Sequence, residues 1–313
     1  MGRMMALRAH TRGGPEVLMY ESAPWPTAGA GDVLVSVDAA AITFDELSWP
    51  ETWVVGGVDR TPVIVSHEFS GVVAALGDGV TGLSVGDEVY GLVPFDRDGA
   101  AAEYVSVPAT SVAIRPSTVS HVVAAAAVLP ALTAWEALVE HAAVEPGRHV
   151  LVHGGAGGVG SFVVQLATAL GASVTATVRT RDVEYVLGLG AERVIDTDQE
   201  SLDAETGVFD VVIDAVGRDI PEALFAALRR GGRLIALQEP PSEEMADKYG
   251  VTALFFIVTA ERDRLAQLAA MIDAGKLTVA VAATFPLAEG RAAYESGAFR
   301  RPRPGKTVLV VRF

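Results

Sequence analysis

The chain of 313 residues carries 24 Lys and Arg against 39 Asp and Glu, which gives a formal net charge of −15 at pH 7. A surface of this sign repels phosphate backbones and anionic headgroups, so we expect neither nucleic-acid nor membrane-surface binding. The sequence contains no cysteine, which excludes disulfides, thiolate nucleophiles and cysteine-ligated zinc. The length predicts two domains.

Up to about Pro116 the apolar segments are short, rich in β-branched residues and closed by Gly, Asp or Pro. This spacing predicts a β-rich, barrel-like domain. Its expected strands lie within residues 33–41, 62–76, 85–93 and 102–108.

From Ser120 to about Ala260 the pattern changes to alternating strands and helices, which predicts a parallel sheet covered by helices. One helix is expected from Gly158 to Leu170, with Gly171 as its left-handed stop, and another from about Asp219 to Gly231 and Gly232. The expected strands are the apolar runs 149–152, 173–178, 193–196, 209–214 and 233–237.

After Ala260 the sequence predicts an amphipathic helix and two strand-like segments, 278–287 and 307–313. Because these segments resemble the first region, we infer that the tail returns to it. The predicted domains are therefore residues 1–117 with 262–313, and residues 118–261.

The most apolar run, residues 122–135, is interrupted by Pro130 and falls short of the roughly 20 residues that span a bilayer. Residues 1–14 show neither the apolar stretch nor the cleavage pattern of a secretory signal. We therefore expect a cytoplasmic protein that is not inserted in a membrane.

A glycine-rich motif, G-x-G-x-x-G, lies between a predicted strand and a predicted helix. In that context it indicates a dinucleotide site. Gly155 would allow the tight turn, Gly157 would admit the pyrophosphate and Gly160 would let helix and strand pack closely, while the helix start offers N–H groups to the phosphates. The alternative is a loop that merely needs glycine. The expected phosphate-binding residues are Gly155, Ala156, Gly157, Gly158, Val159 and Gly160.

Two arginines and a threonine, Arg179, Thr180 and Arg181, follow the next predicted strand. About 20 residues after the glycines, an NAD-specific site usually carries a carboxylate, whereas the first acid here is Asp182. Guanidinium groups pair with phosphate through two hydrogen bonds. This pattern predicts NADPH rather than NADH as the cofactor; a solvated helix start without a ligand is the alternative.

Segments along the whole chain carry a family resemblance: ALRAHTRGGPEVL, SHEFSGVV followed by VGDEVYGL, LPALTAWEAL, VHGGAGGVGS, DAVG and GKTVLVV. In this order they resemble the zinc-independent quinone oxidoreductase branch of the medium-chain dehydrogenase/reductase superfamily. The resemblance implies an α/β fold, with a doubly wound Rossmann sheet that binds the cofactor and a GroES-like β-rich catalytic domain made of both chain ends. It also implies a homodimer that pairs through the cofactor domains.

Positions that bind zinc in other branches of this superfamily are changed here. Thr43 stands where a cysteine would fall, and the Gly-His-Glu motif is replaced by Ser66, His67 and Glu68. A lone His67 cannot complete a tetrahedral site, so no metal is expected. For His67 and Glu68, a structural hydrogen-bonding pair is as acceptable an interpretation as a role in proton transfer.

Without a metal, hydrogen bonds must stabilise the developing oxyanion, which favours a conjugated C=C or a quinone over a simple alcohol. The leading hypothesis is thus an NADPH-dependent reductase of quinones or α,β-unsaturated carbonyls that acts on a small molecule. The alternatives are a non-catalytic NADPH-binding or sensory protein, and a non-reductive enzyme for cyclisation or dehydration.

The resemblance implies further cofactor-binding residues, which follow predicted strands or line the cleft. A helix residue that hydrogen-bonds its own backbone remains the alternative for Thr133, and a core or dimer-edge strand remains the alternative for residues 256–258. These implied residues are Thr133, Ala215, Val216, Gly217, Leu237, Gln238, Phe256, Ile257, Val258 and Lys306.

Residues 43–53 occupy the place where the family puts its substrate pocket. No tyrosine lies between Tyr20 and Tyr90, so protonation by Asp45, His67 or water stays open. Simple packing is the alternative for the two tryptophans. The candidate catalytic residues are Thr43, Asp45 and His67, and the candidate pocket residues are Phe44, Trp49 and Trp53.

Overall fold

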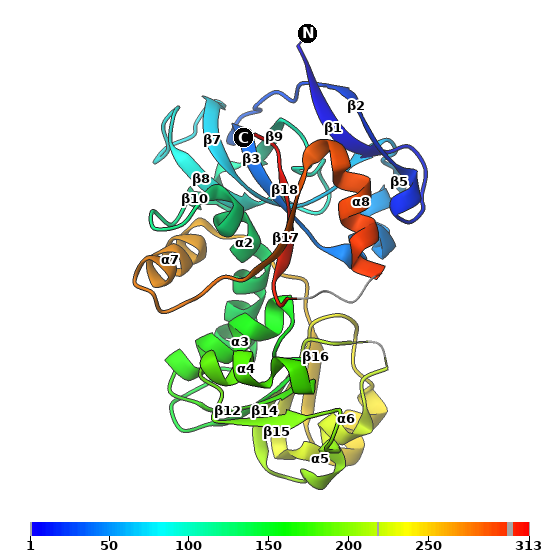
Figure 1. The fold of residues 1–313 in the computed structure, drawn as a ribbon, viewed down its shortest axis with the longest axis vertical. Coiled ribbons are helices and arrows are strands. Elements are labelled where there is room, and N and C mark those ends of the chain that lie inside the picture. Colours follow the sequence, from blue (N-terminus) through cyan, green and yellow to red (C-terminus); the bar gives the residue numbers. More distant parts are fainter. Residues whose placement is uncertain (1, 218, 299–302, 313) are drawn as a thin grey trace. The chain divides into compact units, whose positions relative to one another are not determined.

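The computed structural model describes residues 2–217, 219–298 and 303–312. The chain forms two compact units (Figure 1). The first contains Met1–Leu129, Thr259–Gly275 and Val279–Phe313, and the second contains Pro130–Val258 and Lys276–Thr278.

The first unit is built on a seven-stranded sheet in the order β10-β8-β7-β3-β18-β17, with β9 also paired to β3. Its long central strand buries Val33, Val35 and Val37 completely, as the alternation of apolar residues in a strand requires. The strands are β3 (Asp32–Ile42), β7 (Glu68–Leu76), β8 (Glu88–Leu92), β9 (Tyr104–Pro108), β10 (Val112–Ile114), β17 (Val281–Pro286) and β18 (Lys306–Val310).

Smaller elements complete this unit. A three-stranded sheet has the order β2-β1-β6, and β4 pairs with β5. The C-terminal strand β18 pairs antiparallel with β3, so the tail joins the sheet of the N-terminal region (Figure 1). The bounds are β1 (Arg3–Ala9), β2 (Leu18–Pro24), β4 (Val54–Val55), β5 (Val58–Asp59), β6 (Val63–Ile64), α1 (Pro50–Trp53), α7 (Arg262–Asp273) and α8 (Gly290–Glu295).

The second unit contains a parallel six-stranded sheet in the order β13-β12-β11-β14-β15-β16. Numbered within the unit, this order is 3-2-1-4-5-6, the doubly wound arrangement whose ligands bind beyond the carboxyl ends of the strands where the order reverses. That point lies between β11 and β14. The elements are β11 (His149–His153), β12 (Ser173–Val178), β13 (Arg193–Asp196), β14 (Phe209–Asp214), β15 (Leu228–Ala236), β16 (Thr252–Phe255), α3 (Gly158–Ala169), α4 (Val183–Gly188), α5 (Glu222–Ala227) and α6 (Glu243–Tyr249).

One predicted helix end in the second unit is wrong. Helix α5 ends at Ala227 instead of continuing to Gly231 and Gly232, and β15 begins at once with Leu228. Leu228 pairs with Phe209 of β14, and the register then shifts before the next pair. The two glycines therefore lie in an irregular part of a strand, where the sequence pattern alone suggested a helix stop.

The apolar run around Pro130 is longer than the sequence-based estimate. Helix α2 (His121–Trp135) contains Pro130 and continues as a π-helical segment, Glu136–His141. Together they make 21 residues, long and apolar enough for a membrane span by length and composition alone, but most of this helix is buried within the protein. Such burial is typical of a core helix.

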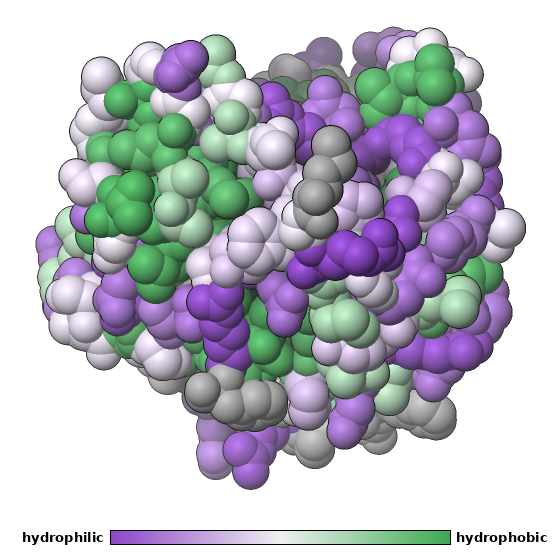
Figure 2. Space-filling model, turned by 90° about the horizontal axis from the view of Figure 1, so that it is seen from above, coloured by the Kyte–Doolittle hydropathy of each residue, from purple (hydrophilic) through white to green (hydrophobic). Residues whose placement is uncertain are grey.

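On the face of the molecule shown in Figure 2, apolar side chains gather mainly in a patch on the left, and polar side chains cover most of the centre and the right. Large apolar side chains that are exposed in the first unit include Met19, Trp25, Val58 and Val85. Scattered exposure of this kind is ordinary for a protein surface.

Candidate functional site

The glycine-rich turn joins β11 to α3 at the point where the sheet order reverses. The backbone of Gly154 is left-handed, with φ +85°, so the tight turn expected at Gly155 is made by Gly154. A Cβ on Gly155 would lie 2.7 Å from Cβ of Ala176 in β12, and one on Gly160 would lie 2.1 Å from the Gly154 carbonyl oxygen. The turn therefore has no room for side chains at these positions.

Thr177, near the end of β12, holds this turn in place. Its hydroxyl accepts the N–H of Gly154 at 3.0 Å and lies 2.8 Å from Nδ1 of His153, and its carbonyl accepts the N–H of Gly155 at 3.0 Å. Burial lowers the pKa of His153, which favours the neutral ring. The sequence marks Thr177 only as a polar residue in a buried strand, so it was not predicted as a site residue.

The start of α3 fits a phosphate group. Its N-cap residue is Gly157, and no side chain described in the structure caps that end. The first N–H groups of a helix lack partners within the helix, and the helix dipole places partial positive charge there. A glycine-rich turn beside free N–H groups is the kind of cradle that binds a dinucleotide pyrophosphate.

Asp214 shapes a second turn, at the end of the neighbouring strand β14. One carboxylate oxygen accepts the N–H groups of Val216 and Gly217, at 3.0 and 3.2 Å. The backbone of Gly217 is left-handed, with φ +64°, and a Cβ there would lie 2.3 Å from Cβ of Gln238. The structure thus brings residues 215–217 next to Gln238 at the carboxyl edge of the sheet. Asp214 was not predicted as a site residue from the sequence.

The three polar residues after β12 differ in their surroundings. Arg179 is exposed, and no described carboxylate pairs with it, whereas Arg181 lies 3.3 Å from Asp182. The Thr180 hydroxyl donates to Asp196 at 2.7 Å, and this bond helps to lower the pKa of Asp196. Arg179 is therefore the guanidinium that can take a phosphate without first giving up an ion pair.

The remaining candidates in the second unit lie on helix α2 and just beyond β16. Thr133 is buried in the helix, and Val258 is buried as well. The Phe256 ring lies 4.5 Å from the ring of His141, and Ile257 is exposed.

In the first unit, three strands bring Thr43, Glu68 and Lys306 together. Lys306 Nζ lies 2.5 Å from Glu68 Oε1 and donates to Thr43 Oγ1 at 2.9 Å. The other Glu68 oxygen accepts the N–H of Leu129 at 3.0 Å. Glu68 is 1% and Lys306 9% exposed. Lys306, which the resemblance implies to face the cofactor, therefore forms a buried ion pair with Glu68.

Glu46 forms a second buried cluster that sequence analysis did not single out. The carboxylate accepts the Tyr294 hydroxyl and, at 3.0 Å, the N–H of Ser66, and it lies 4.0 Å from His67 Nε2. Burial raises the pKa of Glu46 to about 7. Burial and the neighbouring Glu46 carboxylate hold the pKa of Tyr294 well above its usual range.

His67 is neutral in these surroundings, because burial lowers its pKa to about 4. Its Nδ1 lies 3.2 Å from the Val93 carbonyl oxygen, and its ring packs edge-on against Phe95 at 5.1 Å. These contacts favour the structural interpretation of His67 over proton donation at neutral pH.

The two tryptophans of the 43–53 segment have different roles. Trp49 is half-buried with its ring 5.4 Å from that of Phe95. Trp53 is 3% exposed and its indole N–H donates to the Leu47 carbonyl at 3.0 Å, so packing explains it. Asp45 is exposed and Phe44 half-buried. Within the described residues, no group of three or more His, Asp or Glu side chains is placed to hold a metal.

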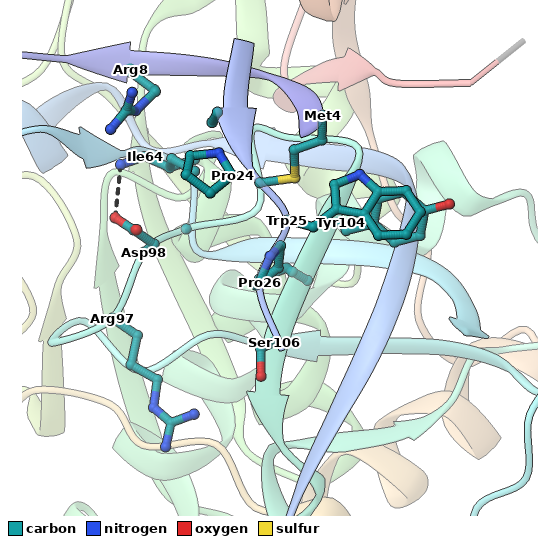
Figure 3. A pocket seen from close by; sticks show the side chains of 13 residues that line it. Met4, Arg8, Pro24, Trp25, Pro26, Ile64, Arg97, Asp98, Tyr104 and Ser106 are labelled. Atoms are coloured by element: carbon teal, nitrogen blue, oxygen red, sulfur yellow. Dashed lines mark hydrogen bonds between the residues drawn. The ribbon is translucent and has the colours of Figure 1, made fainter. Parts of the chain in front are cut away.

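A cavity of about 390 Å³ lies elsewhere in the first unit, and none of the predicted site residues lines it (Figure 3). Trp25 and Tyr104 form one wall, with ring centroids 4.5 Å apart. Its two arginines already pair with carboxylates, Arg8 with Glu21 and Arg97 with Asp32.

Two family models match the chain: the alcohol dehydrogenase GroES-like domain over residues 29–117, and zinc-binding dehydrogenase over residues 189–309. The chain is 33% identical to an NADPH-dependent alkenal/one oxidoreductase from Arabidopsis thaliana, over 85% of this chain and 68% of the relative. It belongs to the medium-chain dehydrogenase/reductase superfamily, in its quinone oxidoreductase branch. This confirms the resemblance to the quinone oxidoreductase branch and the α/β fold class, a Rossmann-like sheet with a GroES-like domain.

Other relatives of this superfamily member differ in length. It is 37% identical to a 2-methylene-furan-3-one reductase from Solanum lycopersicum over 69% of this chain, but it spans only 55% of that protein. Among solved structures, the quinone oxidoreductase from Coxiella burnetii has a TM-score of 0.89 at 28% identity, covering 99% of this chain and 100% of that one. A mycobacterial protein solved in complex with NADPH has a TM-score of 0.84 at 29% identity, covering 98% and 100%.

Proposed function

We propose that the protein is an NADPH-dependent reductase that transfers hydride to a quinone or an α,β-unsaturated carbonyl without zinc. The observation that carries the proposal is the uncapped start of α3 behind a glycine-rich turn, followed by Arg179, which pairs with no carboxylate among the described residues. A pyrophosphate and a 2′-phosphate are the groups that such a pair of sites binds best.

The cofactor would lie along the carboxyl edge of the parallel sheet. The N–H groups at the start of α3 would hold the pyrophosphate, Arg179 the 2′-phosphate, and residues 215–217 with Gln238 the nicotinamide ribose. When bound, NADPH supplies the hydride. The protein supplies the binding energy, the orientation and the exclusion of water.

The substrate class is supported by what the relatives are called. Besides the alkenal/one oxidoreductase, a 2-haloacrylate reductase from Burkholderia is 29% identical over 93% of this chain. Alkenals, alkenones and acrylates share a C=C conjugated to a carbonyl. We therefore propose a conjugated acceptor, whose negative charge is spread over several atoms after hydride transfer.

Zinc independence is proposed from the chemistry of the side chains. Thr43 offers a neutral hydroxyl instead of a thiolate, and Glu68 is already neutralised by Lys306. His67 alone gives a single imidazole, whereas catalytic zinc sites use three protein ligands.

We also propose a homodimer in which the second units associate. Among the described residues, β16 pairs with β15 alone and so leaves one edge of the six-stranded sheet open. Pairing of this edge with a second copy would satisfy its free backbone groups. Sedimentation of the purified protein tests this directly, and a monomer at micromolar concentration would contradict it.

The reaction is tested by mixing the protein with NADPH and a panel of quinones, enones and acrylates while the absorbance of the reduced cofactor is followed. Oxidation that depends on both protein and acceptor is expected. Tight binding of NADPH without oxidation across the panel would favour a sensory protein. Product formation without loss of NADPH would favour a non-reductive enzyme.

A further inference from the structure

The register of three strands places Thr43, Glu68 and Lys306 at one level of the first unit's sheet. β18 runs antiparallel to β3 with Thr307 opposite Ile42, which sets Lys306 beside Thr43. β7 starts with Glu68 opposite Ala41 of β3. Three segments that are far apart in the sequence therefore deliver a hydroxyl, a carboxylate and an ammonium group to one point.

The direction of the hydrogen bonds follows from which atoms carry protons. An ammonium group only donates, so Lys306 donates both to Glu68 and to the Thr43 oxygen. That donation leaves the Thr43 proton available. In the structure the Thr43 hydroxyl donates to Glu68 Oε1 at 3.2 Å, which is long for an O–H···O bond. The Glu68 carboxylate is already satisfied by Lys306 and by the Leu129 N–H.

The three residues are buried to different degrees. Glu68 is buried, Lys306 nearly so, and Thr43 is half-buried. Thr43 is therefore the most exposed of the three residues. In surroundings of low dielectric constant, a hydroxyl that accepts a bond from an ammonium becomes a stronger donor itself.

Other polar groups of the first unit are less suited to donate. Both oxygens of Glu46 are engaged, by Tyr294 and by the Ser66 N–H. His67 is neutral and directed at the Val93 carbonyl. Neither side chain offers a proton to a neighbouring acceptor without breaking its present contacts.

We propose that Thr43 is the catalytic residue that donates a hydrogen bond and then a proton to the carbonyl oxygen of the substrate, and that Lys306, held by Glu68, polarises its hydroxyl. The inference rests on the proposed function, since it requires a conjugated carbonyl acceptor. After the β-carbon has accepted the hydride, the C=C electron pair shifts and the oxygen becomes negative. That oxygen takes the Thr43 proton, Lys306 replaces it at Oγ1, and water returns a proton to Lys306. The enol then tautomerises to the saturated carbonyl.

The first test compares Thr43→Val, which removes the hydroxyl at nearly constant volume, with Thr43→Ser, which keeps it. With an enone that the wild type reduces, we expect Thr43→Val to lower kcat by about 10²–10³-fold, the usual loss of an oxyanion donor, with KM little changed. Thr43→Ser should stay within about tenfold of the wild type, because its hydroxyl can occupy the same place. The NADPH dissociation constant and the unfolding midpoint should be unchanged in both variants.

The second test concerns the role of Lys306. The pair Lys306→Met with Glu68→Gln removes both buried charges together and so avoids an unpaired carboxylate. We expect it to lower kcat, and we expect Thr43→Val to add little further loss in that background, because residues that act as a unit are not additive. Full additivity would overturn the role of Lys306.

The outcomes separate this inference from the proposed function. Wild-type turnover together with unchanged kcat in Thr43→Val would overturn the role of Thr43 and leave the reductase standing. A wild type that binds NADPH but reduces no acceptor would overturn both.

Discussion

At the scale of single residues, Glu46 is a side chain whose charge is disfavoured by burial. Its carboxyl is 1% exposed, and burial raises its pKa from 4.5 to about 7. Between those two values the folded protein binds more protons than the unfolded chain. The contribution of Glu46 to stability is therefore greatest at low pH and is lost as the pH rises through about 7.

The direction of this pH dependence predicts how Glu46→Gln behaves, because the substitution removes the charge and keeps a hydrogen-bonding group. Relative to the wild type, the variant should gain stability by about 1–3 kcal/mol as the pH rises from about 5 to about 8. Urea unfolding of both proteins across this range measures the difference.

His67 has the opposite trend in both proteins, so the prediction concerns the difference between them at each pH. The pKa of His67 is lowered by burial from 6.5 to about 4, so its contribution is lost as the pH falls through that window. A difference between the two proteins that stays constant with pH would contradict the titration of Glu46.

Arg179 gives a second prediction at this scale. Its replacement by alanine should raise the dissociation constant for NADPH by about 10–150-fold, because roughly 1.5–3 kcal/mol of charge-assisted bonding to the 2′-phosphate is lost. NADH binding should barely change. Arg181→Ala is the matched control, and its effect should be smaller because Arg181 already pairs with Asp182. Fluorescence titration with both cofactors is the measurement; equal losses for NADPH and NADH would refute the role of Arg179.

Residues with local signals could be predicted from the sequence, and those with distant partners could not. The glycines and Arg179 were found by spacing along one βαβ unit. Glu46 and Tyr294 are 248 positions apart, so no local pattern marks them. Asp214 and Thr177 lie inside strands that read as apolar runs, and only the folded turns reveal what they bind.

At the scale of elements, the close approach of α3 to the preceding turn leaves no room for a side chain at Gly160. In Gly160→Ala the new Cβ would fall 2.1 Å from a backbone oxygen, so the turn has to move. We expect NADPH affinity to fall by at least about tenfold and stability to fall by about 1–3 kcal/mol, as for overpacking in a core.

The matched control is Gly188→Ala in α4, where the structure leaves open space within 4 Å. That change should leave cofactor binding unaltered and should be neutral or stabilising by up to about 1 kcal/mol, since alanine favours helix. Cofactor titration and thermal unfolding of both variants provide the comparison. Similar behaviour of the two variants would contradict the tight turn.

In the second unit, the predicted bounds agree with the observed ones where a strand is short, apolar and buried on both faces. The predicted bounds of β12, β13 and β14 coincide with the observed ones. The prediction failed at α5 because a glycine pair stops a helix and interrupts a strand equally well. The expected length of the apolar run was also too short at α2, where burial offsets the cost of Pro130 inside a helix.

At the scale of the whole molecule, the C-terminal strand is indispensable to the first unit. β18 lies between β3 and β17 in the sheet, and Val308 and Leu309 are fully buried. A chain that ends at Gly305 would leave two strands unpaired along one side and an open gap in the core.

We expect this truncation to unfold the first unit. In limited proteolysis the strands of residues 1–129 should be cleaved rapidly, whereas residues 130–258, which have their own sheet, should survive longer. Mass spectrometry of the fragments checks this. An unchanged proteolysis pattern and unfolding midpoint would contradict the central place of β18.

The return of the tail to the first unit was predictable from its strand-like composition, but its register was not. The contact between Lys306 and Thr43 joins residues 263 positions apart, and a shift of one residue would turn Lys306 to the other face of the sheet. Only strand pairing decides which polar groups meet.

The most direct test uses NADPH that carries deuterium at C4 of the nicotinamide, with an enone that the protein reduces, followed by mass spectrometry of the product. We expect one deuterium on the β-carbon and none from deuterated water at that position. A product without the label from either face of the cofactor, or a protein that fails to bind NADPH, would contradict hydride transfer at this site.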